Sequence, residues 1–196
     1  MLIATTNPGK IREITRALAG LPVEFRTLAD VAPVPEPEET GRSFAENALL
    51  KANYYARSSL LQTVAEDSGL VIDALGGRPG VHSARYPGAT YADKFAGLYR
   101  ELAGMPRPWT ARFVCALACV GAPGPDGPPV LFTCEGVVRG EIAPAPRGSG
   151  GFGYDPIFYY PPYDRTLGEV GDDRKLAVSH RGQAFRMFAE WIAARG

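Results

Sequence analysis

The order of apolar segments is the feature that most limits how this chain can fold. A short strand pattern at residues 2–5 runs into a turn, and a helical pattern follows over 11–19 with Gly20 as a stop signal. A second helical pattern, at 44–56, begins with a capping box and leads to a strand pattern at 62–65. Strands that alternate with helices in this way indicate an α/β fold.

The second half of the chain adds a long hairpin to this plan. Strand patterns at 111–120 and 130–139 flank a tip rich in proline and glycine, which is typical of an antiparallel hairpin. Helical patterns precede it at 90–102 and close the chain at 183–194. We therefore expect an α/β fold with a mixed sheet. No repeat and no long linker interrupts the chain, so residues 1–196 are predicted to form a single domain.

Charge and cysteine content exclude several classes of function. The 21 acidic and 21 basic residues cancel, whereas proteins that coat nucleic-acid polymers usually carry a basic excess. The three cysteines form an odd set without a signal peptide, which predicts reduced thiols and a cytoplasmic location. The uncharged run at 113–125 is too short to span a bilayer, so we expect no membrane role.

Two adjacent acids, Glu66 and Asp67, follow the strand pattern at 62–65 and precede Ser68-Gly69. We expect them to lie in a turn at the end of that strand, where open α/β sheets place their ligands. A second acidic group at 36–39 could converge on them, and Mg²⁺ needs only one or two protein carboxylates beside substrate phosphates. The alternative is an ordinary acidic surface turn.

Two further segments have the composition of ligand-binding loops. Residues 5–10 combine hydroxyls, backbone donors and Lys10 at a helix start, which suits an anion, although the Walker pattern is absent. The glycines at 148–153 formally match GxGxxG, but Pro156 follows where the dinucleotide fingerprint needs a helix. We interpret that segment as a loop whose Phe152 stacks on a base. Neither a zinc site nor a catalytic triad is supported.

Six segments, in order over nearly the whole chain, resemble the signatures of the non-canonical purine nucleoside triphosphate pyrophosphatases (inosine triphosphate or dITP/XTP pyrophosphatases). These segments are residues 5–10, 39–48, 66–70, 76–86, 150–156 and 179–182. The resemblance implies an elongated mixed sheet flanked by helices, with two lobes around a central active-site cleft. It also implies a homodimer and Mg²⁺-dependent hydrolysis of ITP, dITP and XTP to the monophosphate and pyrophosphate, which cleanses the nucleotide pool.

The resemblance also implies roles for individual residues. Asp67 would be the proton acceptor, and Glu39 with Asp67 would face the metal. The residues expected to hold the phosphates are Thr5, Thr6, Asn7, Pro8, Gly9, Lys10 and Lys175. Those expected to hold the nucleoside are Ser68, Phe152, Gly153, Tyr154, Asp155, His180 and Arg181. We further expect Asp67 and Lys10 to face a single crevice.

Two other functions stay open at this point. One is a related pyrophosphatase for modified pyrimidine triphosphates, which would prefer dTTP or UTP over ITP. The other is a nucleotide sensor that binds without catalysis, which an assay for pyrophosphate would separate from an enzyme. For a purine enzyme, donors from His180 or Arg181 would accept a 6-oxo base and reject adenine, because a buried donor without a partner costs about 1–3 kcal/mol.

Overall fold

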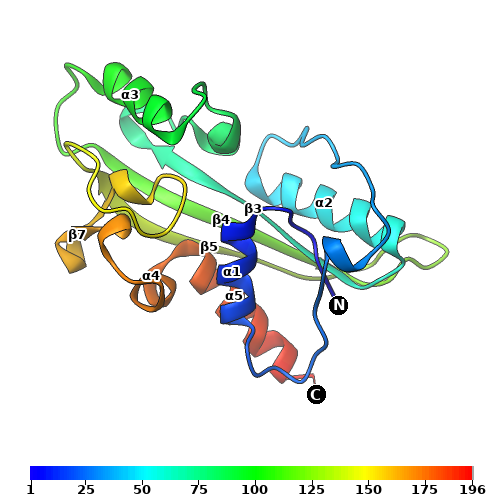
Figure 1. Cartoon of the computed structure of the whole chain (residues 1–196). Helices are drawn as coiled ribbons and strands as arrows, with labels where there is room; N and C mark the ends of the chain where they lie inside the picture. The colour runs from blue at the N-terminus through cyan, green and yellow to red at the C-terminus, as the bar shows by residue number, and fades with distance from the viewer. Residues whose placement is uncertain (196) are drawn as a thin grey trace. The chain divides into compact units, whose positions relative to one another are not determined.

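The computed structural model describes residues 1–195 and contains a seven-stranded mixed sheet with the strand order β2-β1-β3-β4-β5-β6-β7 (Figure 1). The strands are β1 Leu2–Ile3, β2 Arg26–Thr27, β3 Thr63–Ile72, β4 Thr110–Val120, β5 Val130–Ile142, β6 Phe158–Tyr160 and β7 Arg165–Thr166. The helices are α1 Pro8–Ala17, α2 Phe44–Ser59, α3 Tyr91–Leu102, α4 Asp172–Val178 and α5 His180–Ala193. Short 3₁₀ turns lie at Leu28–Asp30, Asp73–Leu75, Gly80–Arg85, Asp155–Ile157, Pro161–Tyr163 and Leu167–Glu169.

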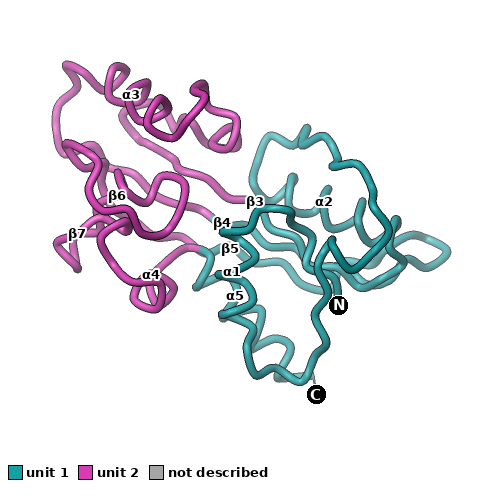
Figure 2. The backbone as a smooth tube through the Cα atoms, in the orientation of Figure 1, with its two compact units in different colours: residues 1–67, 115–136, 181–196 teal, residues 68–114, 137–180 magenta. Residues whose placement is uncertain are grey.

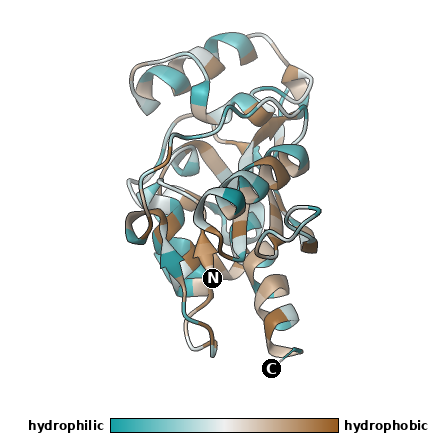
Figure 3. Ribbon diagram, turned by 90° about the vertical axis from the view of Figure 1, so that its right-hand side faces the viewer, coloured by the Kyte–Doolittle hydropathy of each residue, from teal (hydrophilic) through white to brown (hydrophobic). Residues whose placement is uncertain are grey.

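Both parallel and antiparallel pairs occur in this sheet. β1 pairs in parallel with β2 and β3, whereas β6 pairs antiparallel with β5 and β7. The helices carry both hydrophobic and hydrophilic residues (Figure 3). The predicted α/β class with a mixed sheet is confirmed.

The chain divides into two compact units (Figure 2). Unit 1 comprises residues 1–67, 115–136 and 181–196, and unit 2 comprises residues 68–114 and 137–180. Strands β3, β4 and β5 each contribute one part to either unit. The single domain over 1–196 stays a prediction.

In unit 1 the sheet is buried on both faces, and alternate residues of each strand point to opposite faces. On one face Cys115, Leu117 and Cys119 of β4 pack with apolar residues of α1 and α5. On the other face Ala116 and Ala118 pack with residues of α2. The second cluster consists largely of alanine: Ala4, Ala48, Ala52, Ala56, Ala65, Ala116 and Ala118.

Unit 2 has one apolar cluster of its own. Phe95, Leu98 and Leu102 of α3 are buried in it together with Phe113 and Phe158. The Phe113 and Phe158 rings lie 4.4 Å apart between centroids. This core supports the loops that follow β5.

Most helix starts agree with the sequence. Ser43 Oγ accepts a hydrogen bond from the Glu46 amide at 3.1 Å and caps α2, while Thr90 caps α3. The Glu46 carboxylate, however, accepts from the amide of Arg42 at 2.6 Å, so the return bond of the predicted capping box is displaced by one residue. The predicted hairpin strands are neighbours in the sheet, and Gly121 donates to the carbonyl of Pro129 across the tip.

The prediction of an acidic turn at residues 66–67 is wrong. β3 continues without interruption from Thr63 to Ile72, so both acids lie inside a buried strand. Ion pairs and hydrogen bonds compensate the charges of the two acids there, so both carboxylates can be buried within a continuous strand. The sequence also missed α4, and it placed the start of the last helix three residues late, because α5 begins at His180.

Among residues 1–195, no helix combines the length and apolar character needed to cross a bilayer.

Candidate active site

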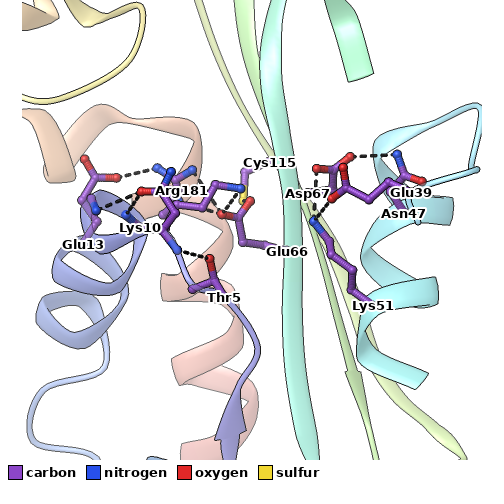
Figure 4. Close-up of polar contacts among 12 residues, drawn as sticks. Thr5, Lys10, Glu13, Glu39, Asn47, Lys51, Glu66, Asp67, Cys115 and Arg181 are labelled. Carbon is purple, nitrogen blue, oxygen red and sulfur yellow. Dashed lines mark hydrogen bonds and ion pairs between the residues drawn. The ribbon is translucent and has the colours of Figure 1, made fainter. Parts of the chain in front are cut away.

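Glu66 and Asp67 leave opposite faces of β3 because they are consecutive residues of one strand (Figure 4). The residues before them fix which face each takes. Val64 packs with α1 and α5, and Ala65 packs with α2. Two residues further along, Glu66 therefore faces α1 and α5, and Asp67 faces α2.

On the α2 face, a lysine joins two carboxylates. Lys51 Nζ lies 2.6 Å from Glu39 Oε1 and 3.3 Å from Asp67 Oδ1. Glu39 comes from the loop before α2, and Asp67 comes from β3. All three side chains are largely buried, with exposed fractions of 13%, 18% and 8% for Lys51, Glu39 and Asp67.

Asn47 fixes the other oxygen of Asp67. Its Nδ2 donates to Asp67 Oδ2 at 3.1 Å, and its Oδ1 accepts from the backbone amide of Gly41 at 2.8 Å. Asn47 is fully buried. A Cβ at Gly41 would lie 2.6 Å from Asn47 Oδ1, so only glycine permits this approach of the loop to α2.

The surroundings of Asp67 on this face raise the pKa of its carboxyl above the value for an exposed aspartate. Burial raises the pKa of the Asp67 carboxyl, and the nearby carboxylate of Glu39 raises it further, while Lys51 opposes both. Burial alone would lower the pKa of Lys51, but Asp67 and the other acids outweigh it and raise that pKa. Lys51 therefore stays charged beside two acids.

On the α1/α5 face, Glu66 is surrounded by cations. Its Oε1 lies 2.9 Å from Lys10 Nζ and 3.2 Å from both Nε and Nη2 of Arg181. Nη1 of Arg181 donates to Glu13 Oε2 at 2.6 Å. The thiol of Cys115 lies 3.6 Å from Glu66 Oε2.

These charges stabilise one another. Burial alone would raise the pKa of Glu66, but Arg181 and Lys10 outweigh it and hold that pKa well below its usual range. Burial raises the pKa of the Cys115 thiol, and the charge of Glu66 adds to the effect, so the thiol stays protonated. Glu66 is consequently a permanent anion in a neutral cluster.

The predicted phosphate segment forms the start of α1. Asn7 caps the helix, and its Oδ1 accepts from the amides of Gly9 and Lys10 at 2.9 and 3.1 Å. Thr5 Oγ1 accepts from the Asn7 amide, and Thr6 Oγ1 donates to Glu36 at 2.6 Å. Pro8 occupies the first helical position. The segment is ordered by its own side chains.

In unit 2, a residue predicted to hold phosphate, Lys175, and one predicted to hold the nucleoside, Asp155, form another buried pair. Lys175 of α4 donates to Asp155, and its ammonium lies 4.5 Å from the centre of the Phe152 ring. Asp155 Oδ2 also accepts from the Phe152 amide at 2.7 Å, while Gly153 has a φ of +66°. Lys175 and Asp155 thus hold the bend that carries Phe152.

Three more of the predicted residues lie in unit 2. The Tyr154 hydroxyl donates to the carbonyl of Ser83 at 2.8 Å. His180 is buried, and its ring stacks on Phe113 with centroids 4.8 Å apart. Ser68 is half-buried in β3, directly after Asp67. The ligand contacts expected of these residues stay predictions.

Asp67 and Lys10 were expected to face a single crevice, and in the structure each pairs with another residue. Lys10 pairs with Glu66, whereas Asp67 pairs with Lys51 on the opposite face of β3. The predicted turn would have let both acids point the same way. A shared crevice stays a prediction. Glu39 and Asp67, by contrast, are brought together through Lys51 as expected of two acids that share a site.

Comparison with known proteins identifies the family of this chain. The model of the Ham1 family matches residues 1–191. The chain belongs to the Ham1 family. A dITP/XTP pyrophosphatase of Geobacillus kaustophilus is 49% identical over 193 residues, covering 97% of this chain and 92% of that protein. The dITP/XTP pyrophosphatase of Bacillus subtilis is 43% identical, with coverages of 98% and 96%.

Solved structures agree with this assignment. A HAM1 protein from Coxiella burnetii superposes with a TM-score of 0.89 at 40% identity and covers 98% of both chains. The Ham1 protein of Staphylococcus aureus gives a TM-score of 0.85 at 34% identity, covering all of this chain and 98% of that one. The mixed-sheet fold predicted from the sequence is therefore the Ham1 fold.

Two residues of this Ham1 site were missed from the sequence, namely Asn47 and Lys51. A signal was available, because the two are four residues apart and must share one face of α2. Glu13, which binds Arg181, lies three residues after Lys10 and shares its helix face in the same way.

The donor set on the α2 face fits a magnesium ion. Among residues 1–195, no group of three or more His, Cys, Asp or Glu side chains is arranged as a complete metal cage. Two carboxylates and one ammonium nevertheless leave one net negative charge at Glu39, Lys51 and Asp67. Magnesium typically takes one or two protein carboxylates and completes its shell with water and phosphate oxygens.

Proposed function

We propose that this chain hydrolyses dITP, XTP and ITP to the nucleoside monophosphate and pyrophosphate in the presence of Mg²⁺. The observation that carries the proposal is the pair of carboxylates, Glu39 and Asp67, joined by Lys51 in a chain of the Ham1 family. The names of relatives at 43% and 49% identity, dITP/XTP pyrophosphatases, support dITP and XTP among these substrates. The chain is accordingly a hydrolase acting on acid anhydrides.

Asp67 would accept a proton from the attacking water. The water oxygen bonds to the α-phosphorus, the bond from that phosphorus to the bridging oxygen breaks, and pyrophosphate leaves. Burial and Glu39 raise the pKa of Asp67 above that of an exposed aspartate, which makes it the better base. Asn47 holds one oxygen of Asp67 and so aims the other.

Glu39 and Asp67 would hold Mg²⁺, which when bound offsets the negative charge that develops on the phosphates. Lys51 contacts both carboxylates and holds them close together before substrate arrives. Thr5, Thr6, Asn7, Pro8, Gly9 and Lys10 are proposed to contact phosphate oxygens at the start of α1, and Lys175 is proposed for the same role from unit 2. The amides of Gly9 and Lys10 donate to Asn7, which holds the start of α1 in one conformation before phosphate binds.

The nucleoside contacts are proposed for Ser68, Phe152, Gly153, Tyr154, Asp155, His180 and Arg181. The Phe152 ring lies over a fixed lysine, so its other face would suit a purine. A homodimer and a cytoplasmic location are part of the same proposal. The homodimer follows from the resemblance, and the location follows from the odd set of cysteines.

A substrate screen tests the proposal. Release of pyrophosphate and monophosphate is measured for dITP, XTP, ITP, dATP, GTP and dTTP, with Mg²⁺ and with EDTA. We expect turnover of the three oxo-purines, little turnover of dATP and none in EDTA. Equal rates on dATP and dITP contradict the purine selectivity, a preference for dTTP identifies the pyrimidine enzyme, and binding without pyrophosphate release identifies a sensor.

A further inference from the structure

One oxygen of Glu66 receives two cations from two different helices. Lys10 of α1 approaches Oε1 to 2.9 Å, and Arg181 of α5 approaches the same atom through two nitrogens, each at 3.2 Å (Figure 4). The Glu66 side chain is almost fully buried, so water screens these contacts little. The position of each cation therefore depends on this carboxylate.

The same two helices are linked a second time. Glu13 of α1 accepts from Arg181 Nη1 at 2.6 Å, one turn along the helix from Lys10. Two anions and two cations thus form a neutral chain of β3, α1 and α5 side chains, Lys10–Glu66–Arg181–Glu13. Arg181 is held by Glu13 as well as by Glu66, so changing Glu13 disturbs Arg181 directly and tests that contact separately.

We propose that Glu66 is a positioning residue, which sets the places of the Lys10 ammonium and the Arg181 guanidinium and neither binds metal nor transfers a proton. The inference rests on the proposed function, in which Lys10 contacts the triphosphate and Arg181 the base. One carboxylate then couples affinity for the phosphates to selectivity for the base.

The direction of the side chain argues against a metal role. Glu66 faces α1 and α5, whereas Glu39 and Asp67 meet on the α2 face. A cation held by Glu39 and Asp67 would have to reach through the backbone of β3 to contact Glu66. The carboxylate of Glu66 is also already neutralised by two cations, so it attracts a third charge weakly.

The variant Glu66→Gln keeps the size of the side chain and removes its charge. We expect kcat/KM for dITP to fall about 10- to 100-fold, chiefly through KM, because hydrogen bonds to charged groups are worth more than neutral ones. The preference for dITP over dATP should fall as well. A fall in kcat alone, with KM and selectivity unchanged, overturns the proposal.

A double-mutant cycle separates positioning from general damage. If Glu66 acts on the triphosphate through Lys10, adding Glu66→Gln to Lys10→Met should change the inhibition constant of inorganic triphosphate, which has no base to contact Arg181, by less than about twofold. Multiplicative losses in that inhibition constant overturn the inference. Glu13→Gln is the partner test, since it disturbs Arg181 and leaves the contact between Lys10 and Glu66 intact. This variant should reduce the preference for dITP over dATP, while the inhibition constant of inorganic triphosphate as a competitor stays the same.

Two more variants serve as controls, one for misfolding of Glu66→Gln and one for general disturbance around Glu66. Glu66→Asp keeps the charge on a shorter side chain, and its cycle with Lys10→Met replaces the glutamine cycle if Glu66→Gln does not fold. Cys115→Ala removes a further neighbour of the carboxylate and should leave kcat and KM within about twofold of the original chain. If the unaltered chain turns over no dITP, the proposed function fails; if it turns over dITP and the cycle is multiplicative, only the inference about Glu66 fails.

Discussion

Glu66 and Asp67 are adjacent acids with opposite surroundings. On the α1/α5 face, Glu66 meets Lys10 and Arg181, and its pKa is held below the usual range. On the α2 face, Asp67 meets one lysine and a second carboxylate, and its pKa is raised. One residue of sequence therefore separates a permanent anion from a group able to accept a proton. The difference arises from the alternation of a strand and from the charges of the helices on either side.

The largest effect is expected for Asp67→Asn. If the two faces have distinct roles, kcat for pyrophosphate release from dITP should fall about 10²–10⁴-fold, the usual contribution of a general base. Thermal unfolding should remain cooperative, because the single amide oxygen can still accept from Asn47 or from Lys51, although not from both as the two carboxylate oxygens do. Equal losses of kcat in Asp67→Asn and Glu66→Gln would remove the distinction between the faces.

A smaller effect is expected for Lys51→Met, which leaves Glu39 and Asp67 without their shared cation. The free energy of unfolding, measured by urea denaturation, should fall by about 1–3 kcal/mol. Mg²⁺ should restore more stability to this variant than to the original chain, because the ion replaces the missing positive charge. An identical Mg²⁺ effect on both proteins would argue against a metal at these acids.

Asn47→Ala tests how strongly activity depends on the orientation of the Asp67 carboxylate on the α2 face. Loss of the bond to Asp67 Oδ2 should lower kcat about tenfold, which corresponds to one hydrogen bond to a charged group. Asn53→Ala is the matched control, because Asn53 lies on the same helix and donates only to the carbonyl of Leu49 among the bonds found. A control that loses as much activity as Asn47→Ala would show that α2 itself, rather than the contact, was disturbed.

The smallest effect is expected for Ser43→Ala. Ser43 caps α2, and loss of the cap should lower the free energy of unfolding by about 1 kcal/mol. Packing holds the rest of α2 in place, so kcat should change by less than about twofold. A larger change in kcat would mean that the helix start and the acids move together.

Local rules predicted the helices from the sequence. The capping box predicted before residues 44–56 corresponds to Ser43 at the start of α2, and the helical patterns at 90–102 and 183–194 correspond to α3 and α5. Glu39 and Asp67 were also predicted together, on the basis of the resemblance. These features depend on spacing within a short segment or on a complete motif.

The pairing of charges could not be predicted in the same way. Two carboxylates followed by Ser-Gly are typical of a turn, and only the approach of Lys10 and Arg181, 171 positions apart in the printed sequence, makes a buried strand tolerable there. Lys51 was missed because an amphipathic helix usually exposes its lysines. Such contacts depend on tertiary packing, which the periodicity of apolar residues in the sequence does not reveal.

The alanine-rich layer beneath α2 has a consequence for the reach of Lys51. Methyl groups are the largest side chains that Ala48 and Ala52 offer to the strands, so the helix can lie close against them. A lysine of fixed length touches Glu39 and Asp67 only at that spacing. Each carbon added to the side chains at these positions would increase the distance between α2 and the sheet. The Lys51 ammonium would then no longer contact Glu39 and Asp67, although neither acid had been altered.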